Sequence, residues 1–421
     1  MLDKLKSLWG VKDIRNSVLF VLGVVIVYRI AAHIPVPGVN AQALKSLFES
    51  NQILGLLDLF SGGGISRFSV VALGVAPYIT ASIIFQLLTM VVPRLEDLSK
   101  EPGGYAKINT WTRWLTVPLA MFQGFSLLSL LRQQSQVDLI PALSIWQTLL
   151  AMVTITAGTV FLMWLGEIIS EKHVGNGVSL IIFVGIVGAL PGVIQRFLST
   201  YDGSQWLTIV VFAIVTVITI AAVVLINEGT RNIPVSYARH IRGGAGPVNN
   251  YLPLKVNAAG VIPIIFAVSL LLFPPLIAQF TSQAKAQWLV EVSRWVIATF
   301  QNQTFYGITY FVLVFAFTYF YTSVVFHPEQ IAENLQKQGG FIPGIRPGEQ
   351  TKTYLSQVSS HILLAGALFL GLIAVMPVVI QAITGSQNLI IGGTSILIVV
   401  SVVVEAIKQV EAQMTMRDYD I

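Results

Sequence analysis

The sequence contains no cysteine among its 421 residues. Disulfide bonds, thiol nucleophiles and cysteine-ligated metals are therefore excluded. Charged residues are also scarce, at 11% of the chain, whereas soluble domains carry about 25%. Hydrophobic residues make up 54%, and the mean hydropathy is +0.75. This composition predicts a polytopic membrane protein.

Constellations typical of catalysis and metal binding are missing from the sequence. None of the five histidines forms a His-Glu-x-x-His pair or lies deep within an apolar run, so we expect no metal site. The serines lack a Gly-x-Ser-x-Gly context with a paired histidine. There is no Gly-x-x-x-x-Gly-Lys-Ser/Thr loop for a nucleotide phosphate. We therefore expect neither enzymatic activity nor a cofactor.

Acidic residues are nearly absent from the apolar runs. Glu167, Glu228 and Glu405 stand at the ends of such runs rather than in the middle. A proton- or sodium-coupled transporter usually carries carboxylates inside the membrane. An ion-coupled secondary transporter is therefore the weaker alternative to a passive channel.

Ten apolar segments are long enough to cross a bilayer, which takes about 20 residues. They lie near residues 16–36, 70–92, 112–132, 143–168, 176–196, 206–227, 256–280, 303–326, 360–382 and 390–410. With the N-terminus in the cytoplasm, 18 of the 25 Lys and Arg residues fall on the cytoplasmic side. The exceptions are Arg29, Lys45, Arg67, Arg132, Arg196, Lys285 and Arg294. The positive-inside rule therefore predicts that both termini are cytoplasmic.

Two loops on the predicted cytoplasmic side are long, at 227–255 and 327–359. Long ordered loops tend to be functional. In the second, HPEQIAENLQKQGG predicts a short helix ended by glycine, and FIPGIRPGEQT is rich in turn residues. This pattern favours a shaped docking surface, and a solvated spacer is the alternative.

One stretch, residues 60–90, combines apolar character with residues that interrupt helices. Three consecutive glycines stand at its start, and Gly74 and Pro77 follow. We expect a short, loosely held segment at about 57–71 and a firm helix from about 73 to 92. Irregular backbone at membrane depth survives only where protein buries it or where it lines a watery cavity.

The second half of the chain has a matching interrupted segment. Residues 256–280 contain Pro263, Pro274 and Pro275, and this segment comes second in its half, as 70–92 does in the first. Matched broken segments are typical of inverted repeats with a pathway at the repeat interface. We therefore predict two inverted halves of five spans each, at 1–200 and 201–421.

Branched aliphatic residues recur at helical spacing on two of these spans. Val75 and Ile79 stand at i, i+4 on the second span, and Val178 and Ile182 do so on the fifth. Such pairs point to one face of a helix and can form a narrow apolar constriction. Contact with lipid or with another helix is the alternative, and spacing alone does not decide between them.

Several long motifs together resemble the SecY family of protein-conducting channels, along nearly the whole chain. The motifs are FSGGGISRFSVVALGVAPYITASIIFQLLT at 60–89, GNGVSLIIFVGIV at 175–187, LPLKVNAAGVIPIIFA at 252–267, FIPGIRPGEQT at 341–351 and GGTSILIVV at 392–400. The resemblance implies an all-α membrane protein with a clamshell of two five-helix halves around an hourglass pore. It also implies translocation of unfolded polypeptides across, and sideways release into, the bacterial cytoplasmic membrane.

The resemblance further implies roles for individual residues. The pore ring would be Val75, Ile79, Val178, Ile182, Ile265 and Ile398. The plug would cover about 57–70, with Phe60, Gly62, Gly63, Gly64 and Arg67. The lateral gate, between the second and third spans on one side and the seventh and eighth on the other, would carry Thr80, Gln86, Gln123, Asn257 and Phe273.

Two alternatives to these assignments stay open. Arg67 would be a loop arginine in external water if the segment around it were not a plug. The polar gate residues would be ordinary interhelical hydrogen-bonding groups, and Phe273 would be a packing residue.

The family also implies partners in the membrane and on the predicted cytoplasmic surface. They are the small membrane subunits SecE and SecG, the motor ATPase SecA, the ribosome, signal peptides and nascent chains, and membrane lipids. Docking of the motor or the ribosome would involve Arg239, Arg242 and Arg346; lipid headgroups are the alternative partner for these charges. Residues 237–255 have a Gly-rich tip where the family carries more basic residues. Because ribosomal RNA contacts depend on positive charge, we predict weaker and more salt-sensitive ribosome binding than that of a typical family member.

Overall fold

Each of the ten predicted spans coincides with one long helix in the computed structural model. The structure describes residues 12–36, 61–133, 144–199, 206–237, 250–282, 286–384 and 391–418. The ten helices are α2 (Lys12–Ala31), α5 (Ala76–Val91), α7 (Gly104–Gln133), α8 (Ile145–Glu171), α9 (Gly177–Ser199), α10 (Trp206–Glu228), α11 (Ile262–Thr281), α13 (Gln303–Val325), α15 (Glu349–Thr384) and α16 (Ile391–Asp418). The chain is an all-α polytopic membrane protein in its spanning part.

Four of these helices pass a strict test of length and hydropathy for a membrane span within the described residues. They are α2, α8, α13 and α15, and α5 passes when it is joined to the short helix that follows it across a bend of 106°. Three of the others are interrupted by proline. α7 and α9 each contain one proline in the helix interior, and α11 contains two there.

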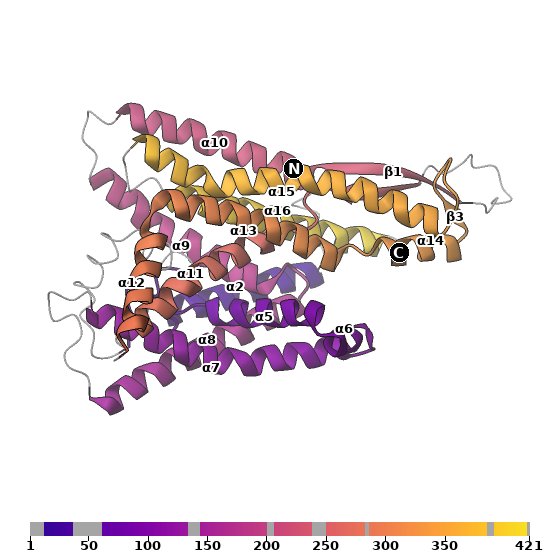
Figure 1. Cartoon of the computed structure of the whole chain (residues 1–421). Coiled ribbons are helices and arrows are strands. Elements are labelled where there is room, and N and C mark those ends of the chain that lie inside the picture. Colours follow the sequence, from indigo (N-terminus) through magenta and orange to yellow (C-terminus); the bar gives the residue numbers. More distant parts are fainter. Residues whose placement is uncertain are drawn as a thin grey trace.

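The helices lie side by side, with short elements at both ends (Figure 1). α6 (Pro93–Lys100) and α14 (Pro328–Lys337) lie at one end, together with the strands β1 (Thr230–Tyr237), β2 (Asn250–Lys255) and β3 (Gly340–Phe341). α12 (Gln287–Gln301) lies at the other end. We call the first end the loop side and the second end the distal side.

The two long loops of the loop side are joined by a small antiparallel sheet in the order β2-β1-β3, which the sequence did not predict. β1 pairs with β2 from Thr230↔Lys255 to Val235↔Asn250, and its end pairs with β3. A separate apolar core holds the sheet against α15 and contains Ile233, Leu254, Ile342 and Leu355. The loops are therefore an ordered platform in their described parts.

Several predicted boundaries differ from the structure. The first span was expected to reach residue 36, but α2 ends at Ala31. The loop at 327–359 was expected to last until 359, but α15 already begins at Glu349. The predicted short helix in this loop is confirmed as α14, and Gly339 follows it with a φ of +70°.

The second span begins at Ala76 instead of about residue 73. Gly74 has a φ of +57°, which lies outside the helical region and suits glycine. Pro77 occupies the first turn of α5, where its missing N–H costs no hydrogen bond. The helix ends at Val91 because Val92 precedes Pro93 and is extended.

The two halves of the chain meet along two lines of contact. α11 packs against α5 and α7, and α16 packs against α9. In Figure 1 the helices α5, α7 and α8 lie on one side of α11, and α13, α15 and α16 lie on the other. α11 therefore stands at the interface between the halves.

Candidate functional site

A narrow cavity of about 70 Å³ lies where α5, α7, α9 and α11 meet. Its lining is almost wholly apolar and combines residues from both halves with two from the glycine-rich segment. The lining residues are Ser61, Ile65, Leu73, Val75, Ala76, Ile79, Thr80, Gln123, Leu127, Ile182, Ile265, Val268, Ser269, Leu272 and Phe273. The cavity therefore touches all three predicted parts: ring, plug and lateral gate.

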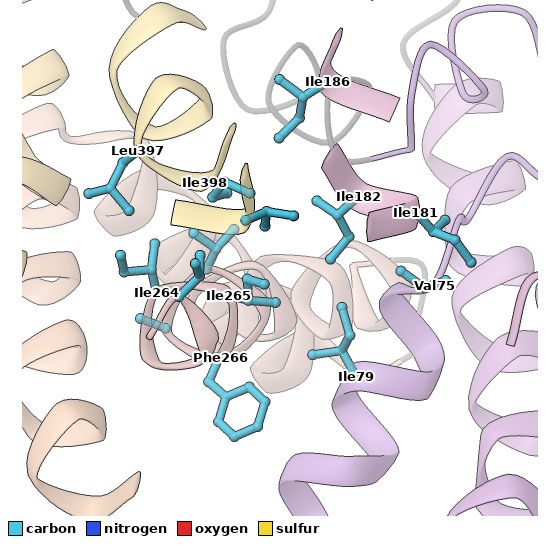
Figure 2. Packing of buried hydrophobic residues seen from close by; sticks show 14 of the residues in the cluster. Val75, Ile79, Ile181, Ile182, Ile186, Ile264, Ile265, Phe266, Leu397 and Ile398 are labelled. Carbon is cyan, nitrogen blue, oxygen red and sulfur yellow. The ribbon is translucent and has the colours of Figure 1, made fainter. Parts of the chain in front are cut away.

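Five of the six predicted ring residues are buried in one apolar cluster. Figure 2 shows Val75 and Ile79 at the beginning of α5, with Ile182, Ile265 and Ile398 arranged around the same centre. Ile398 is completely buried, and Ile265 is 6% exposed. The structure thus brings these aliphatic side chains from four segments to one place.

The sixth ring residue, Val178, packs against the same cluster but, like Ile398, does not line the cavity. It is half-buried and packs beside Gly166 of α8, where a methyl group on the glycine would lie 3.3 Å from Val178 Cγ2. Ile186, one turn beyond Ile182, is 1% exposed in the same cluster. In Figure 2, Ile182 lies beside Ile79, Ile265 and Ile398, whereas Ile186 lies farther from them.

α5 and α11 begin with the same short motif. Gly74-Val75-Ala76-Pro77-Tyr78-Ile79 corresponds to Gly-Val-Ile-Pro-Ile-Ile at 260–265. Both glycines have positive φ, at +57° and +62°, and both prolines lie in the first helical turn. The isoleucine that ends each motif is a predicted ring residue. This repeat was a sequence signal for the site that the i, i+4 spacing of aliphatic residues does not reveal.

The glycine-rich segment is held more firmly than predicted. Residues 57–60, including Phe60, lie outside the described residues, but Ser61, Ile65, Phe68 and Ser69 are each 3% exposed or less. The hydroxyl of Tyr28 donates to the Ser61 carbonyl at 3.2 Å. The expectation of a loosely held segment is therefore wrong for residues 61–70.

The beginning of this segment fits closely between two helices. Gly62 has a φ of +70°, and a methyl group placed on it would overlap the Tyr28 hydroxyl and lie 2.7 Å from Gly185 Cα. Gly63 has a similar φ of +78° but open space around it. Gly64 is buried, and a methyl group there would lie 3.0 Å from the Ser61 carbonyl oxygen.

Only three of the five predicted gate residues come together. Thr80, Gln123 and Phe273 line the cavity between α5, α7 and α11. The amide of Gln86 donates to Ser82 on its own helix at 3.1 Å. Gln86 therefore does not line the cavity and lies farther along α5.

Asn257 is held by its own half of the chain. Its Nδ2 donates to Asn227 Oδ1 at 2.8 Å and to the Gly260 carbonyl at 3.2 Å. Asn227 in turn donates to Ser401 Oγ at 2.9 Å, and Lys408 Nζ donates to the Asn227 carbonyl at 3.0 Å. These hydrogen bonds tie α10 and α16 to the segment that precedes α11, and none of them is made to α5 or α7.

The predicted docking residues are only partly described. Arg346 is exposed in the turn between β3 and α15, and its carbonyl accepts a 2.9 Å hydrogen bond from Thr351. Lys352 contacts Glu349 and Glu329 at 3.3 Å each. The hydrogen bond to Glu349, followed by that to Glu329, raises the pKa of Lys352. The Lys352 ammonium group therefore stays charged. Arg239 and Arg242 lie outside the described residues.

Possible metal ligands do not gather in the described part of the chain. Its residues contain no group of three or more His, Asp or Glu side chains that could hold a metal ion. The arrangement instead offers an apolar collar between two halves, with a buried segment lying against it.

Comparison with known proteins agrees with this geometry. A family profile described as SecY matches residues 69–407. The protein translocase subunit SecY of Streptomyces scabiei is 41% identical, with 100% of this chain and 99% of that protein covered. The subunit of the same name from Mycobacterium bovis is 42% identical over 97% of this chain and 96% of its own length.

Solved structures share the fold. One described as the structure of a protein conducting channel matches with a TM-score of 0.67 at 20% identity, covering 94% of this chain and 91% of its own. Sec61 in the canine ribosome-channel complex from the endoplasmic reticulum matches with a TM-score of 0.63 at 20% identity and 94% and 91% coverage.

Proposed function

The chain belongs to the SecY family, and from this premise we propose that it is the pore-forming subunit of a protein translocase. Unfolded polypeptides would pass between its two halves, and apolar membrane segments would leave sideways into the lipid. The observation that carries the proposal is the apolar cavity shared by Val75, Ile79, Ile182 and Ile265 at the contact between the halves.

An apolar collar suits this task because of its physical chemistry. A constriction lined by aliphatic side chains is costly for water and ions to enter. An extended peptide can widen it by separating side chains that are held only by van der Waals contact, and the collar closes again behind the peptide. Passage of a chain and retention of ions are thus compatible.

Sideways release would use the contact between α11 and the pair α5 and α7. Thr80, Gln123 and Phe273 line the cavity at this seam. A signal peptide or membrane segment is as apolar as lipid, so it gains by moving from the cavity into the bilayer. Separation of α11 from α5 would open that path, while the α9–α16 contact would serve as the hinge.

The driving force would come from partners on the loop side. The sequence carries no nucleotide-binding loop, so an external motor such as SecA or a translating ribosome would supply the energy. The platform formed by the sheet, α14 and Arg346 is the proposed docking surface, with SecE and SecG as membrane partners. We place the loop side and both termini in the bacterial cytoplasm, in line with the distribution of Lys and Arg.

Site-specific crosslinking tests the proposal. A photoreactive amino acid is placed at Ile79, at Ile265 or at Leu270, which is 38% exposed on α11. A preprotein is then arrested during transport through proteoliposomes that contain the full complex. Crosslinks from positions 79 and 265 but not 270 support a pore through the cavity. Crosslinks from position 270 alone would overturn it.

A further inference from the structure

The distal end of α2 and the glycine-rich segment are joined side by side. Val36 N–H donates to the Phe68 carbonyl at 2.8 Å, and Val70 N–H donates to the Ile34 carbonyl at 3.0 Å. These two bonds form a short antiparallel bridge between Pro35 and Ser69. The end of the first span is therefore built onto the segment that lies against the cavity.

Arginine side chains strengthen the same junction. Arg29 Nη1 donates to the Gly62 carbonyl at 3.4 Å, and Arg29 Nη2 donates to the Gly188 carbonyl of α9 at 3.2 Å. One guanidinium group thus connects α2, the glycine-rich segment and α9. The backbone carbonyl of Arg29 also makes a contact, because His33 Nδ1 lies 2.7 Å from its oxygen.

His33 is the acceptor for the other arginine. Arg67 Nη1 lies 2.6 Å from His33 Nε2. A guanidinium group has donors and no acceptor, so Nε2 must carry no proton. The ring proton is then on Nδ1, which donates to the Arg29 carbonyl. The two contacts fix a neutral imidazole in one tautomer.

We propose that His33 is a plug-positioning residue whose neutral imidazole holds Arg67, so that a proton arriving from the distal side releases this contact. The inference rests on the proposed plug role of residues 57–70. Protonation would give Nε2 a hydrogen and place a positive charge against the Arg67 guanidinium. The contact would change from a charge-assisted hydrogen bond to a repulsion between two cations.

The surroundings of His33 favour this response. The side chain is exposed, and it lines a groove on the face of α2 together with Val25, Ile26, Arg29, Ile30 and Ile34. Because His33 follows the last residue of α2, Ala31, it stands at the distal end of the span, and its exposed side chain is open to that side. The imidazole is the one group in this junction that can gain a proton, because a guanidinium group is always protonated.

The charges around His33 would not compensate a proton. Arg29 and Arg67 are both cations. The charged residues of the helices that pack on α2 are Glu167 and Glu171 on α8 and Arg196 on α9, whose side chain lies outside the description. The α8 carboxylates are at its loop-side end, where the adjoining Lys172 lies over Phe20, about 20 Å along α2 from His33.

The test is ion leak through the purified complex in a planar bilayer, with each chamber at its own pH. For the natural sequence, lowering the distal chamber from about pH 7.5 to about pH 5.5 should raise the leak about tenfold, reversibly. The same change in the loop-side chamber should have little effect. His33→Gln keeps an acceptor for Arg67 without a titrating ring, so its leak should stay low at both values.

A matched control is available in this chain. His361 on α15 is also exposed, and its Nδ1 lies 2.7 Å from the carbonyl four residues earlier, at Gln357. His361→Gln should keep the full pH response. A response that persists in His33→Gln, or one that disappears in His361→Gln, would overturn the inference. If deletion of 57–70 causes no leak at either pH, the plug role itself fails instead.

Discussion

Ile79 of α5 and Ile265 of α11 occupy the same position in two copies of one Gly-Val-x-Pro-x-Ile motif, and both line the same cavity. Each motif opens with a glycine of positive φ and continues into a helix whose first turn contains the proline. The two halves thus use one local design to begin a helix at membrane depth and to present an isoleucine to the interface.

Polar substitution of these two residues tests the collar. Ile79→Ser and Ile265→Ser should each raise ion leak during protein transport several-fold, because a hydroxyl lowers the cost of wetting a narrow apolar constriction. The measurement is membrane-potential decay in proteoliposomes during transport. Leu270→Ser, on the exposed face of α11, is the control. An equal leak in all three variants would contradict the collar.

Substitution of two neighbouring glycines, Gly62 and Gly63, distinguishes the effect of close packing from that of backbone strain at the start of the proposed plug. Gly62→Ala and Gly63→Ala both place a side chain at positive φ, which costs about 1 kcal/mol. Only the methyl group at position 62 meets Tyr28 and Gly185. Gly62→Ala should therefore open the closed channel to ions much more often than Gly63→Ala. Indistinguishable single-channel records would show that this contact does not hold the plug.

Asn257 is expected to act on stability more than on gating. Asn257→Ala removes its bond to Asn227 and should lower the free energy of unfolding by about 1 kcal/mol. In a double-mutant cycle with Asn227→Ala, most of this loss should be shared between the two sites. The measurement is thermal unfolding in detergent, alongside transport of preproteins with weakened signal peptides. Strict additivity together with altered signal selectivity would instead make Asn257 a gate residue.

Charge reversal on the loop side tests the docking surface. Arg346→Glu should reduce motor-driven transport at least tenfold without raising the ion leak, because the residue is far from the collar. Lys337→Glu is the comparison within the same surface, since Lys337 is another exposed cation, at the end of α14, and pairs with Glu333 at 3.2 Å. Motor binding and transport are measured for both variants. Equal losses would indicate a general effect of charge on this surface and no specific role for Arg346.

The sequence was sufficient to predict the helices, and the family resemblance named aliphatic residues of which five lie in one cluster. Neither was sufficient for contacts set by backbone conformation. Val75 and Ile79 were found from i, i+4 spacing, because helical periodicity is local. The hydrogen-bond partner of Asn257, Asn227, could not be found in this way, because either half of the chain could offer a polar group to Asn257. The start of α5 at Ala76 depended on the φ of Gly74, and periodicity does not report φ.

The contacts that hold residues 61–70, part of the proposed plug, could not be predicted from the sequence either. Glycines in a row indicated a segment that moves easily, since glycine costs little to reorient. The structure uses Gly62 for the opposite purpose, to allow close contact with Tyr28 and Gly185. The contact between Arg67 and His33 joins residues 34 positions apart, and neither residue belongs to a periodic pattern.

The most direct test of the central claim is the conductance of the purified complex in a planar bilayer, before and after deletion of residues 57–70. The account predicts that the intact channel is closed to ions and that the deletion produces frequent, brief openings. Absence of conductance in both forms would mean that the cavity between the two halves is not a pore and that residues 57–70 do not plug it.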